Sequence, residues 1–317
     1  MTDKIEHTFT IPDELGGMRL DQALSKYFPE FSRTQIQEWI KSGDITVNEK
    51  TRKARDTILG GETVTINAVR KTQPSFHAQP IALHIIYEDD DLIVINKPVG
   101  MVVHPAAGNH DNTLLNALLH HAPSLQALPR AGILHRLDKN TSGLLVIAKT
   151  HHALQHLSKQ LKTHAIVRIY QAIVFGVMTS GGTIDQPIAR HPIQRKRMAV
   201  IETGKPAVTH YRIIERYRAY TRLKVQLETG RTHQIRVHMA YIRHPLLGDP
   251  VYGGRLQLPK GASPALIKKL REFKYQALHA SELSLTHPVT QKIMSWQAPI
   301  PEDMQELIDI LKIDALS

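Results

Sequence analysis

The sequence predicts an α+β fold, in which a mixed, largely antiparallel sheet with packed helices follows a small α/β domain. The sheet is indicated by short apolar segments that alternate with amphipathic ones after about residue 80 and that share several hairpin-like connections. A separate N-terminal domain is indicated by charge, because residues 1–70 carry a net charge of −1 and residues 71–317 carry +12. At 317 residues the chain is long enough for two domains.

The first domain is expected to span residues 1–69, with its core at about 16–68. Apolar residues at helical spacing predict two helices, and short β-type runs predict a hairpin-like element after them. Ser32 is the expected N-cap of the second helix. The predicted elements are helices at 18–28 and 32–43 and strands at 45–47 and 64–66.

The next ten residues, 70–79, show no periodicity and are interpreted as a linker. The second domain is then expected to cover residues 80–317. Apolar runs of strand length alternate there with helical patterns. The predicted strands are 81–87, 92–96, 144–148, 166–175, 207–214 and 223–227, and the predicted helices are 113–121 and 153–161.

Composition excludes several classes of protein. The chain has no cysteine, which rules out disulfides, thiolate metal sites, iron–sulfur clusters and thiol nucleophiles. No apolar run approaches the roughly 20 residues of a membrane helix, and the N-terminus lacks the apolar segment of a signal peptide. A cytoplasmic protein without a membrane partner is therefore expected, and we expect it to be a monomer.

The basic charge indicates a polyanionic partner. The net charge is +11, and residues 151–250 hold 16 basic side chains against 5 acidic ones. This concentration in one region is what a phosphate-binding face requires, so we expect a nucleic acid partner. The candidate RNA-binding residues of this region are Arg195, Lys196, Arg197 and Arg231. In the first domain, one basic edge is predicted from Arg33, Lys41, Arg52, Lys53 and Arg55.

The most unusual segment runs from Arg130 to Leu145, where an apolar stretch leads into a polar loop and then into an apolar strand. Asp138 lies in this loop, at the edge of the predicted core and among cationic neighbours. Spacing alone favours an ordinary turn, because the loop consists of turn-forming residues. A catalytic interpretation requires an ionised carboxylate, and the ordinary pKa of an aspartate, about 3.9, satisfies this at neutral pH.

Longer motifs favour the catalytic interpretation. His135-Arg136-Leu137-Asp138 with Thr141 to Leu145 resembles the catalytic signature of the pseudouridine synthases of the large ribosomal RNA type. Three further segments resemble this family in the same order: Glu88 to Pro105, Val167 to Tyr170 and Gly230 to Asp249. The N-terminal pattern of Arg19-Leu20-Asp21, Ser32-Arg33, Gly43 and Val47-Asn48 resembles the S4 RNA-binding domain.

The resemblance implies an isomerase that converts uridine to pseudouridine in large-subunit ribosomal RNA, with no cofactor and no metal. Asp138 would be the catalytic carboxylate, acting either as a nucleophile or as a base. Tyr170 would stack on the target uracil, and Ile235 would form an apolar wall over it. Arg236 would pair with Asp138, although Arg231 is close enough in sequence to do so instead.

The resemblance implies less defined roles for four further residues. Arg136 would either fill the space left by the flipped nucleotide or make a structural ion pair. His135, Lys97 and Lys139 are interpreted as framework residues or phosphate contacts.

Three alternatives remain open from the sequence. The same chemistry could act on a different ribosomal or transfer RNA site. A non-catalytic S4-type assembly factor would suit every feature except the segment from His135 to Leu145. A metal hydrolase is suggested by the histidines at 104, 110, 233, 238 and 244, but His-Glu-x-x-His is absent, so surface or RNA-facing histidines are the preferred interpretation.

Overall fold

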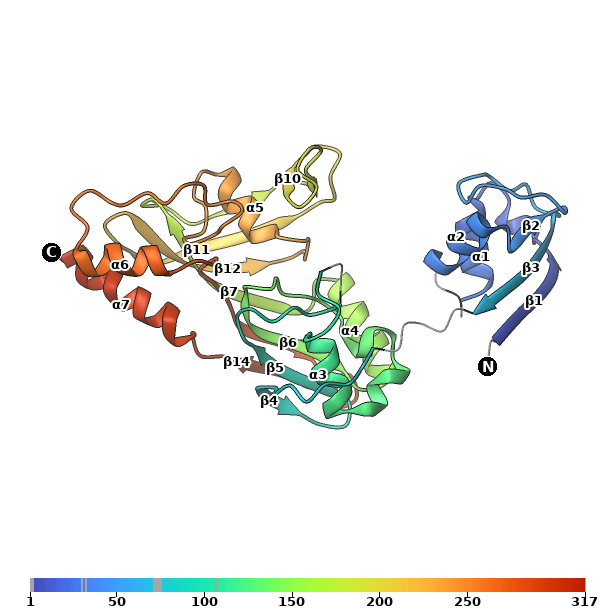
Figure 1. Cartoon of the computed structure of the whole chain (residues 1–317), viewed down its shortest axis with the longest axis horizontal. Coiled ribbons are helices and arrows are strands. Elements are labelled where there is room, and N and C mark those ends of the chain that lie inside the picture. Colours follow the sequence, from blue (N-terminus) through green and yellow to red (C-terminus); the bar gives the residue numbers. More distant parts are fainter. Residues whose placement is uncertain (1–2, 30, 32, 71–75, 106–107, 317) are drawn as a thin grey trace. The chain divides into compact units, whose positions relative to one another are not determined.

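The computed structural model describes residues 3–29, 31, 33–70, 76–105 and 108–316. The chain divides into two compact units, Met1–Ser75 and Phe76–Ser317, which Figure 1 shows in blue and in the remaining colours. Half of the linker expected at 70–79, residues 71–75, and the N-cap expected at Ser32 lie outside the described residues.

The first unit is a three-stranded antiparallel sheet with two helices, in the sheet order β1-β3-β2. Its elements are β1 (Asp3–Thr10), α1 (Leu20–Tyr27), α2 (Arg33–Ser42), β2 (Ile45–Val47) and β3 (Thr63–Arg70). The sequence pattern does not predict β1. Its described side chains are mostly exposed, so the strand carries little apolar pattern and is held by pairing with β3 instead.

A buried carboxylate joins the two helices of this unit. Asp21 of α1 is fully buried and accepts hydrogen bonds from Arg33 Nη2 at 2.8 Å and from Arg19 Nε at 3.1 Å. Burial alone would raise the pKa of Asp21, but the bonds from Arg19, Gln37 and Arg33 lower it to about 2. Because the folded-state pKa is depressed, the stabilisation is complete above the unfolded-state pKa of about 3.9 and is lost as pH falls.

We therefore expect Asp21→Asn to destabilise the first unit by about 2 kcal/mol at pH 7. The loss relative to the wild type should shrink as pH falls from about 5 towards 2. Denaturant unfolding followed by Trp39 fluorescence, in a Trp296→Phe background, would report on this unit. Asp13→Asn, at an exposed site in the same unit, is the matched control. An equal loss at all pH values would contradict a contribution from ionised Asp21.

The second unit is built on one long mixed sheet. Its strand order is β4-β5-β6-β13-β7-β12-β11-β8, and β14 pairs with β13. Among the strand pairs that the described residues form in this sheet, only β13–β6 is parallel. The strands are β4 (Ile85–Glu88), β5 (Leu92–Lys97), β6 (Ser142–Ala148), β7 (Val167–Phe175), β8 (Gly182–Asp185), β11 (Val208–Arg216), β12 (Tyr220–Leu227), β13 (Leu278–Thr286) and β14 (Ile293–Gln297). A separate hairpin is formed by β9 (Ile188–Arg190) and β10 (Met198–Val200).

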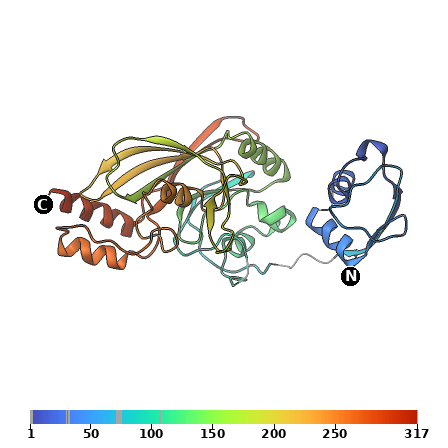
Figure 2. The same cartoon turned by 90° about the horizontal axis from the view of Figure 1, so that it is seen from above.

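Helices cover this sheet at different places, as Figures 1 and 2 show. The helices are α3 (Leu114–His121), α4 (His151–Lys162), α5 (Gln234–Tyr241), α6 (Pro264–Glu272) and α7 (Glu302–Leu316). Side chains of α3 and α4 join two separate apolar clusters on β5 and β6, while α6 and α7 lie side by side over one end of the sheet. The predicted α+β class with a largely antiparallel sheet is confirmed.

One predicted boundary is wrong for a clear reason. The strand expected from Ile81 begins only at Ile85. The preceding backbone is bonded elsewhere, because Gln79 N donates to Asn116 O of α3 and His77 O accepts from Asn116 Nδ2. No helix of the described chain is long and apolar enough to cross a membrane.

Candidate active site

Asp138 lies in the loop that leads into β6, and strand β13 fixes the end of that loop. The backbone carbonyl of Asp138 accepts a hydrogen bond from Thr141 N, which closes the turn and leaves the Asp138 carboxylate available for other partners. Thr141 Oγ1 accepts from Gln276 Nε2, and Ser142 Oγ bonds to His279 Nδ1. The polar residues that look like turn formers in the sequence therefore anchor a buried strand.

The close pairing of β6 with β13 requires a glycine at position 143. Its φ is +113°, and a Cβ at this position would lie 2.2 Å from Ala280 O of the parallel strand β13. A side chain would push β6 away from β13 and would displace the loop that carries Asp138.

Lys97 holds the same loop from the other side. It is fully buried, and its Nζ donates to the carbonyl oxygens of Pro98, Met101 and Lys139. Burial lowers the pKa of Lys97 to about 7, although nearby Asp138 acts in the opposite direction. Its complete burial makes Lys97 a framework residue rather than a phosphate contact.

The carboxylate of Asp138 is paired with a buried arginine. Arg236 Nη1 donates to Asp138 Oδ2 at 2.9 Å, and the same guanidinium donates to both carboxylate oxygens of Asp249, at 2.7 and 3.0 Å. Arg236 and Asp249 are both buried, whereas the Asp138 side chain keeps 15% exposure. Asp249 thus fixes Arg236, and Arg236 directs its remaining edge at the partly exposed carboxylate.

The choice between the two candidate arginines follows from this geometry. Arg231 Nε donates to Pro206 O and makes no ion pair with Asp138, since Arg236 occupies that position.

The carboxylate of Asp249 is held in its ionised form by its partners. Burial would raise the pKa of Asp249, but its bonds with Arg236 and with the backbone of Val251 and Tyr252 lower it.

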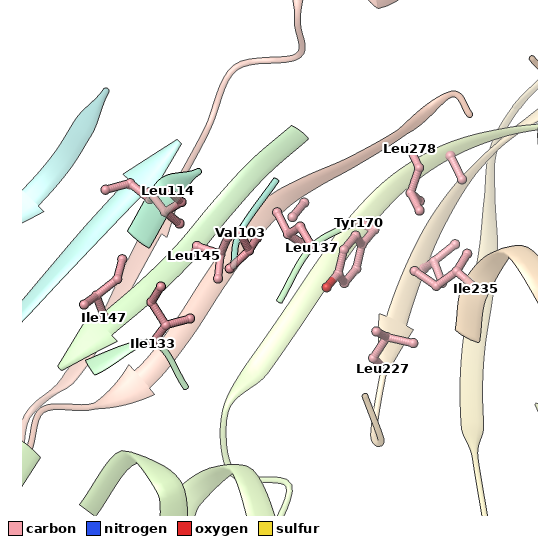
Figure 3. Packing of buried hydrophobic residues seen from close by; sticks show 14 of the residues in the cluster. Val103, Leu114, Ile133, Leu137, Leu145, Ile147, Tyr170, Leu227, Ile235 and Leu278 are labelled. Atoms are coloured by element: carbon pink, nitrogen blue, oxygen red, sulfur yellow. The ribbon is translucent and has the colours of Figure 1, made fainter. Parts of the chain in front are cut away.

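An apolar surface adjoins the ion pair. Leu137, Tyr170 and Ile235 belong to one buried cluster, and Figure 3 shows Tyr170 between Leu137 on one side and Ile235 and Leu227 on the other. Tyr170 is on β7, where it pairs in register with Val225 and Ala280, so its ring is set by two neighbouring strands. A carboxylate beside a rigid aromatic ring is a suitable environment for a planar base.

Besides Asp249, two residues of the site were not predicted from the sequence. His233 Nε2 lies 3.8 Å from Asp138 Oδ1, and its Nδ1 bonds to the Tyr252 hydroxyl at 2.8 Å. The Tyr252 ring lies against the guanidinium groups of both Arg236 and Arg197, and its hydroxyl accepts from Met198 N of β10. Tyr252 thus connects the hairpin of β9 and β10 with Arg236.

Local sequence offers little signal for either residue. His233 stands before α5 with φ +58°, a left-handed conformation that its neighbours do not indicate. Tyr252 follows Asp249 in a turn, where the carboxylate bonds to the Tyr252 backbone nitrogen.

The remaining predicted residues are exposed side chains. Arg136 is exposed, and no hydrogen bond or ion pair of its side chain is found within the described part of the chain. Arg195 and Lys196 are exposed between β9 and β10. In the first unit all five candidates are exposed, and the guanidinium of Arg33 is bound to Asp21: Arg33, Lys41, Arg52, Lys53 and Arg55.

The histidines require a correction. His238 was interpreted as surface or RNA-facing, but it is fully buried and bonds to Thr209 Oγ1 and Gln186 O. It is a core residue because α5 packs against β11. His135 is also structural: its Nε2 accepts from Val146 N, and burial lowers its pKa to about 3, so it is neutral at pH 7.

One group of side chains in the described residues has the spacing of metal ligands, namely Asp89, Asp91 and His287. It contains none of the histidines considered for a hydrolase. Its acceptors already have protein donors, because Asp89 binds Tyr87 Oη, His287 Nε2 and two backbone nitrogens. These contacts account for the cluster as a structural network.

Comparison with known proteins agrees with this geometry. Residues 91–241 match the RNA pseudouridylate synthase family, and residues 18–64 match the S4 domain. The chain is 55% identical over 315 residues to ribosomal large subunit pseudouridine synthase D of Escherichia coli strain K12, covering 99% of this chain and 97% of that protein. It is 53% identical to the protein of the same name from Pseudomonas aeruginosa, covering 99% and 98%.

Solved structures agree as well. The structure of human RNA pseudouridylate synthase domain containing 4 aligns with a TM-score of 0.57 and 27% identity, covering 72% of this chain and 92% of that one. With these relatives, the chain belongs to the RNA pseudouridylate synthase family and carries an S4 domain ahead of its synthase domain.

Proposed function

We propose that this protein isomerises specific uridines to pseudouridine in large-subunit ribosomal RNA, with Asp138 as the reacting carboxylate. The observation that carries the proposal is the partly exposed Asp138 carboxylate, held by Arg236 beside the Tyr170 ring. The name shared by the bacterial relatives supports the large-subunit RNA as substrate.

The reaction needs only what such a site offers. The N1–C1′ bond breaks, the uracil turns, and C5 forms a bond to C1′ while its proton leaves to solvent or to a base. No electron or external group is transferred. Asp138 would either attack the nucleoside to form a covalent adduct or remove a ribose proton to give a glycal.

The other residues would place the nucleotide. Tyr170 would stack on the extruded uracil, Ile235 would cover it, and Arg136 would enter the space that it leaves. Arg195, Lys196 and Arg197 would hold phosphates outside the site, as would Arg231. The S4 domain would add contacts to the same RNA, and one copy of the chain would suffice, since both carboxylates and Arg236 come from a single chain.

Tritium release tests this proposal. Large-subunit rRNA labelled at uracil C5 must lose its label when C5 becomes bonded to C1′. We expect the purified protein to release tritium from bacterial large-subunit rRNA and not from a labelled transfer RNA pool. Release only from transfer RNA would assign a different substrate, and no release from either would favour a non-catalytic RNA-binding protein.

A further inference from the structure

A buried arginine near the proposed active site lacks an anionic partner. Arg168 lies on β7 two residues before Tyr170, so both side chains point to the same face of the strand, and Arg168 is only 7% exposed. Its Nη2 donates to Glu228 O at 3.1 Å. Its Nε is buried and has no hydrogen-bond partner, and no carboxylate of the described residues lies within ion-pair distance of it.

This arrangement is costly in the free protein. A buried charge normally has a counter-ion, and a buried N–H normally has an acceptor. Two other arginines of this unit follow the rule: Arg236 has two carboxylates, and Arg218 binds the carboxylate and the backbone carbonyl of Asp314. The Nε of Arg197 also lacks a partner, but Arg197 is only half-buried. Arg168 is more buried than Arg218, whose side chain is 34% exposed, yet it has only one carbonyl.

The guanidinium of Arg168 lies close to segments that form the proposed active site. A Cβ on Gly230 would lie 2.7 Å from Arg168 Nη1, so the guanidinium lies against the segment that leads into His233 and α5. The positive charge of Arg168 also acts on His135 and Tyr170. Burial is the larger cause of the lowered pKa of His135, and Arg168 lowers it further. Burial raises the pKa of Tyr170, and Arg168 acts in the opposite direction.

We propose that Arg168 binds a backbone phosphate of the RNA next to the uridine that stacks on Tyr170. The inference rests on the proposed function, because it takes the occupant of the Tyr170 site to be a nucleotide. An RNA provides its negative charge as phosphate, and a planar guanidinium with free donors matches phosphate oxygens. The Nε of Arg168 gains its missing acceptor only when the RNA is bound.

The test compares Arg168→Met with Arg218→Met. Methionine keeps the apolar stem of Arg168, and Glu228 O retains His164 Nδ1 as a partner, so nothing buried is left unsatisfied. We expect the melting temperature of Arg168→Met to equal or exceed that of the wild type. Arg218→Met strands the buried carboxylate of Asp314 and should lower the melting temperature by roughly 5 °C or more.

Binding is measured on a bacterial large-subunit rRNA transcript over a range of salt concentrations. We expect Arg168→Met to bind at least about tenfold more weakly and its salt slope to fall by about 0.7 to 0.9, the value for one lost phosphate contact. Arg222→Met, whose guanidinium is held by Gln171, is the control and should keep the wild-type slope.

Two results would overturn the inference: an unchanged affinity or salt slope, or a loss of stability like that of Arg218→Met. Weaker binding with an unchanged slope would assign Arg168 to the base instead. Tritium release by the wild type is measured on the same transcript. If the wild type releases no tritium, the proposed function fails, whereas the binding comparison between the wild type and Arg168→Met still tests the phosphate contact.

Discussion

Asp138→Asn is expected to abolish tritium release, with a loss of roughly 10⁴-fold or more, while RNA binding is retained. Asparagine has the same shape and can still accept a hydrogen bond from Arg236 Nη1 through its side-chain oxygen. It can neither attack the nucleoside nor accept a proton at neutral pH. Both proposed routes through Asp138 therefore fail in this variant, so the prediction does not depend on which route operates.

Retained folding is part of this prediction. Arg236 remains neutralised by Asp249, so the substitution does not strand a buried charge. The melting temperature and the RNA affinity of Asp138→Asn should stay close to those of the wild type. Asp185→Asn, at an exposed position on β8, is the matched control and should keep full activity. Tritium release by Asp138→Asn at the wild-type rate would remove Asp138 from the mechanism.

Asp138 could be predicted from the sequence because its signal is local. Apolar residues flank the polar loop, and the loop matches a family signature of consecutive residues. Strands β5 and β6 were predicted for the same reason, since each contains a short, continuous apolar run. The edge strand β1 has no such run and could not be found in this way.

The partners of Asp138 are harder to predict from the sequence, because they come from distant segments. Arg236 is 98 positions away along the chain, and the resemblance named it as the partner with Arg231 as an open alternative. Only the fold shows that Asp249 takes one edge of Arg236 and turns the other towards Asp138. His233 and Arg168 were missed for a related reason: a backbone conformation and a missing partner leave no pattern in the sequence.

Arg236→Met is expected to remove both activity and stability. Asp249 is 3% exposed and would lose Arg236, its one cationic partner among the described residues, which typically costs about 3 to 5 kcal/mol. Without Arg236, only the backbone bonds from Val251 and Tyr252 oppose the effect of burial, so the pKa of Asp249 rises relative to the wild type. Protonation then relieves the buried charge, so the stability gap between this variant and the wild type should narrow as pH falls. Denaturant unfolding between pH 7 and pH 4 measures this gap.

A second substitution separates the structural role of Arg236 from its role at Asp138. In Arg236→Met/Asp249→Asn the buried charge is gone, and the asparagine oxygen can still accept from the backbone nitrogens of Val251 and Tyr252. We expect most of the lost stability to return, together with RNA binding. Tritium release should stay at the level of Arg236→Met, because Asp138 still lacks the guanidinium that orients it. Recovery of activity along with stability would mean that Arg236 serves the fold alone.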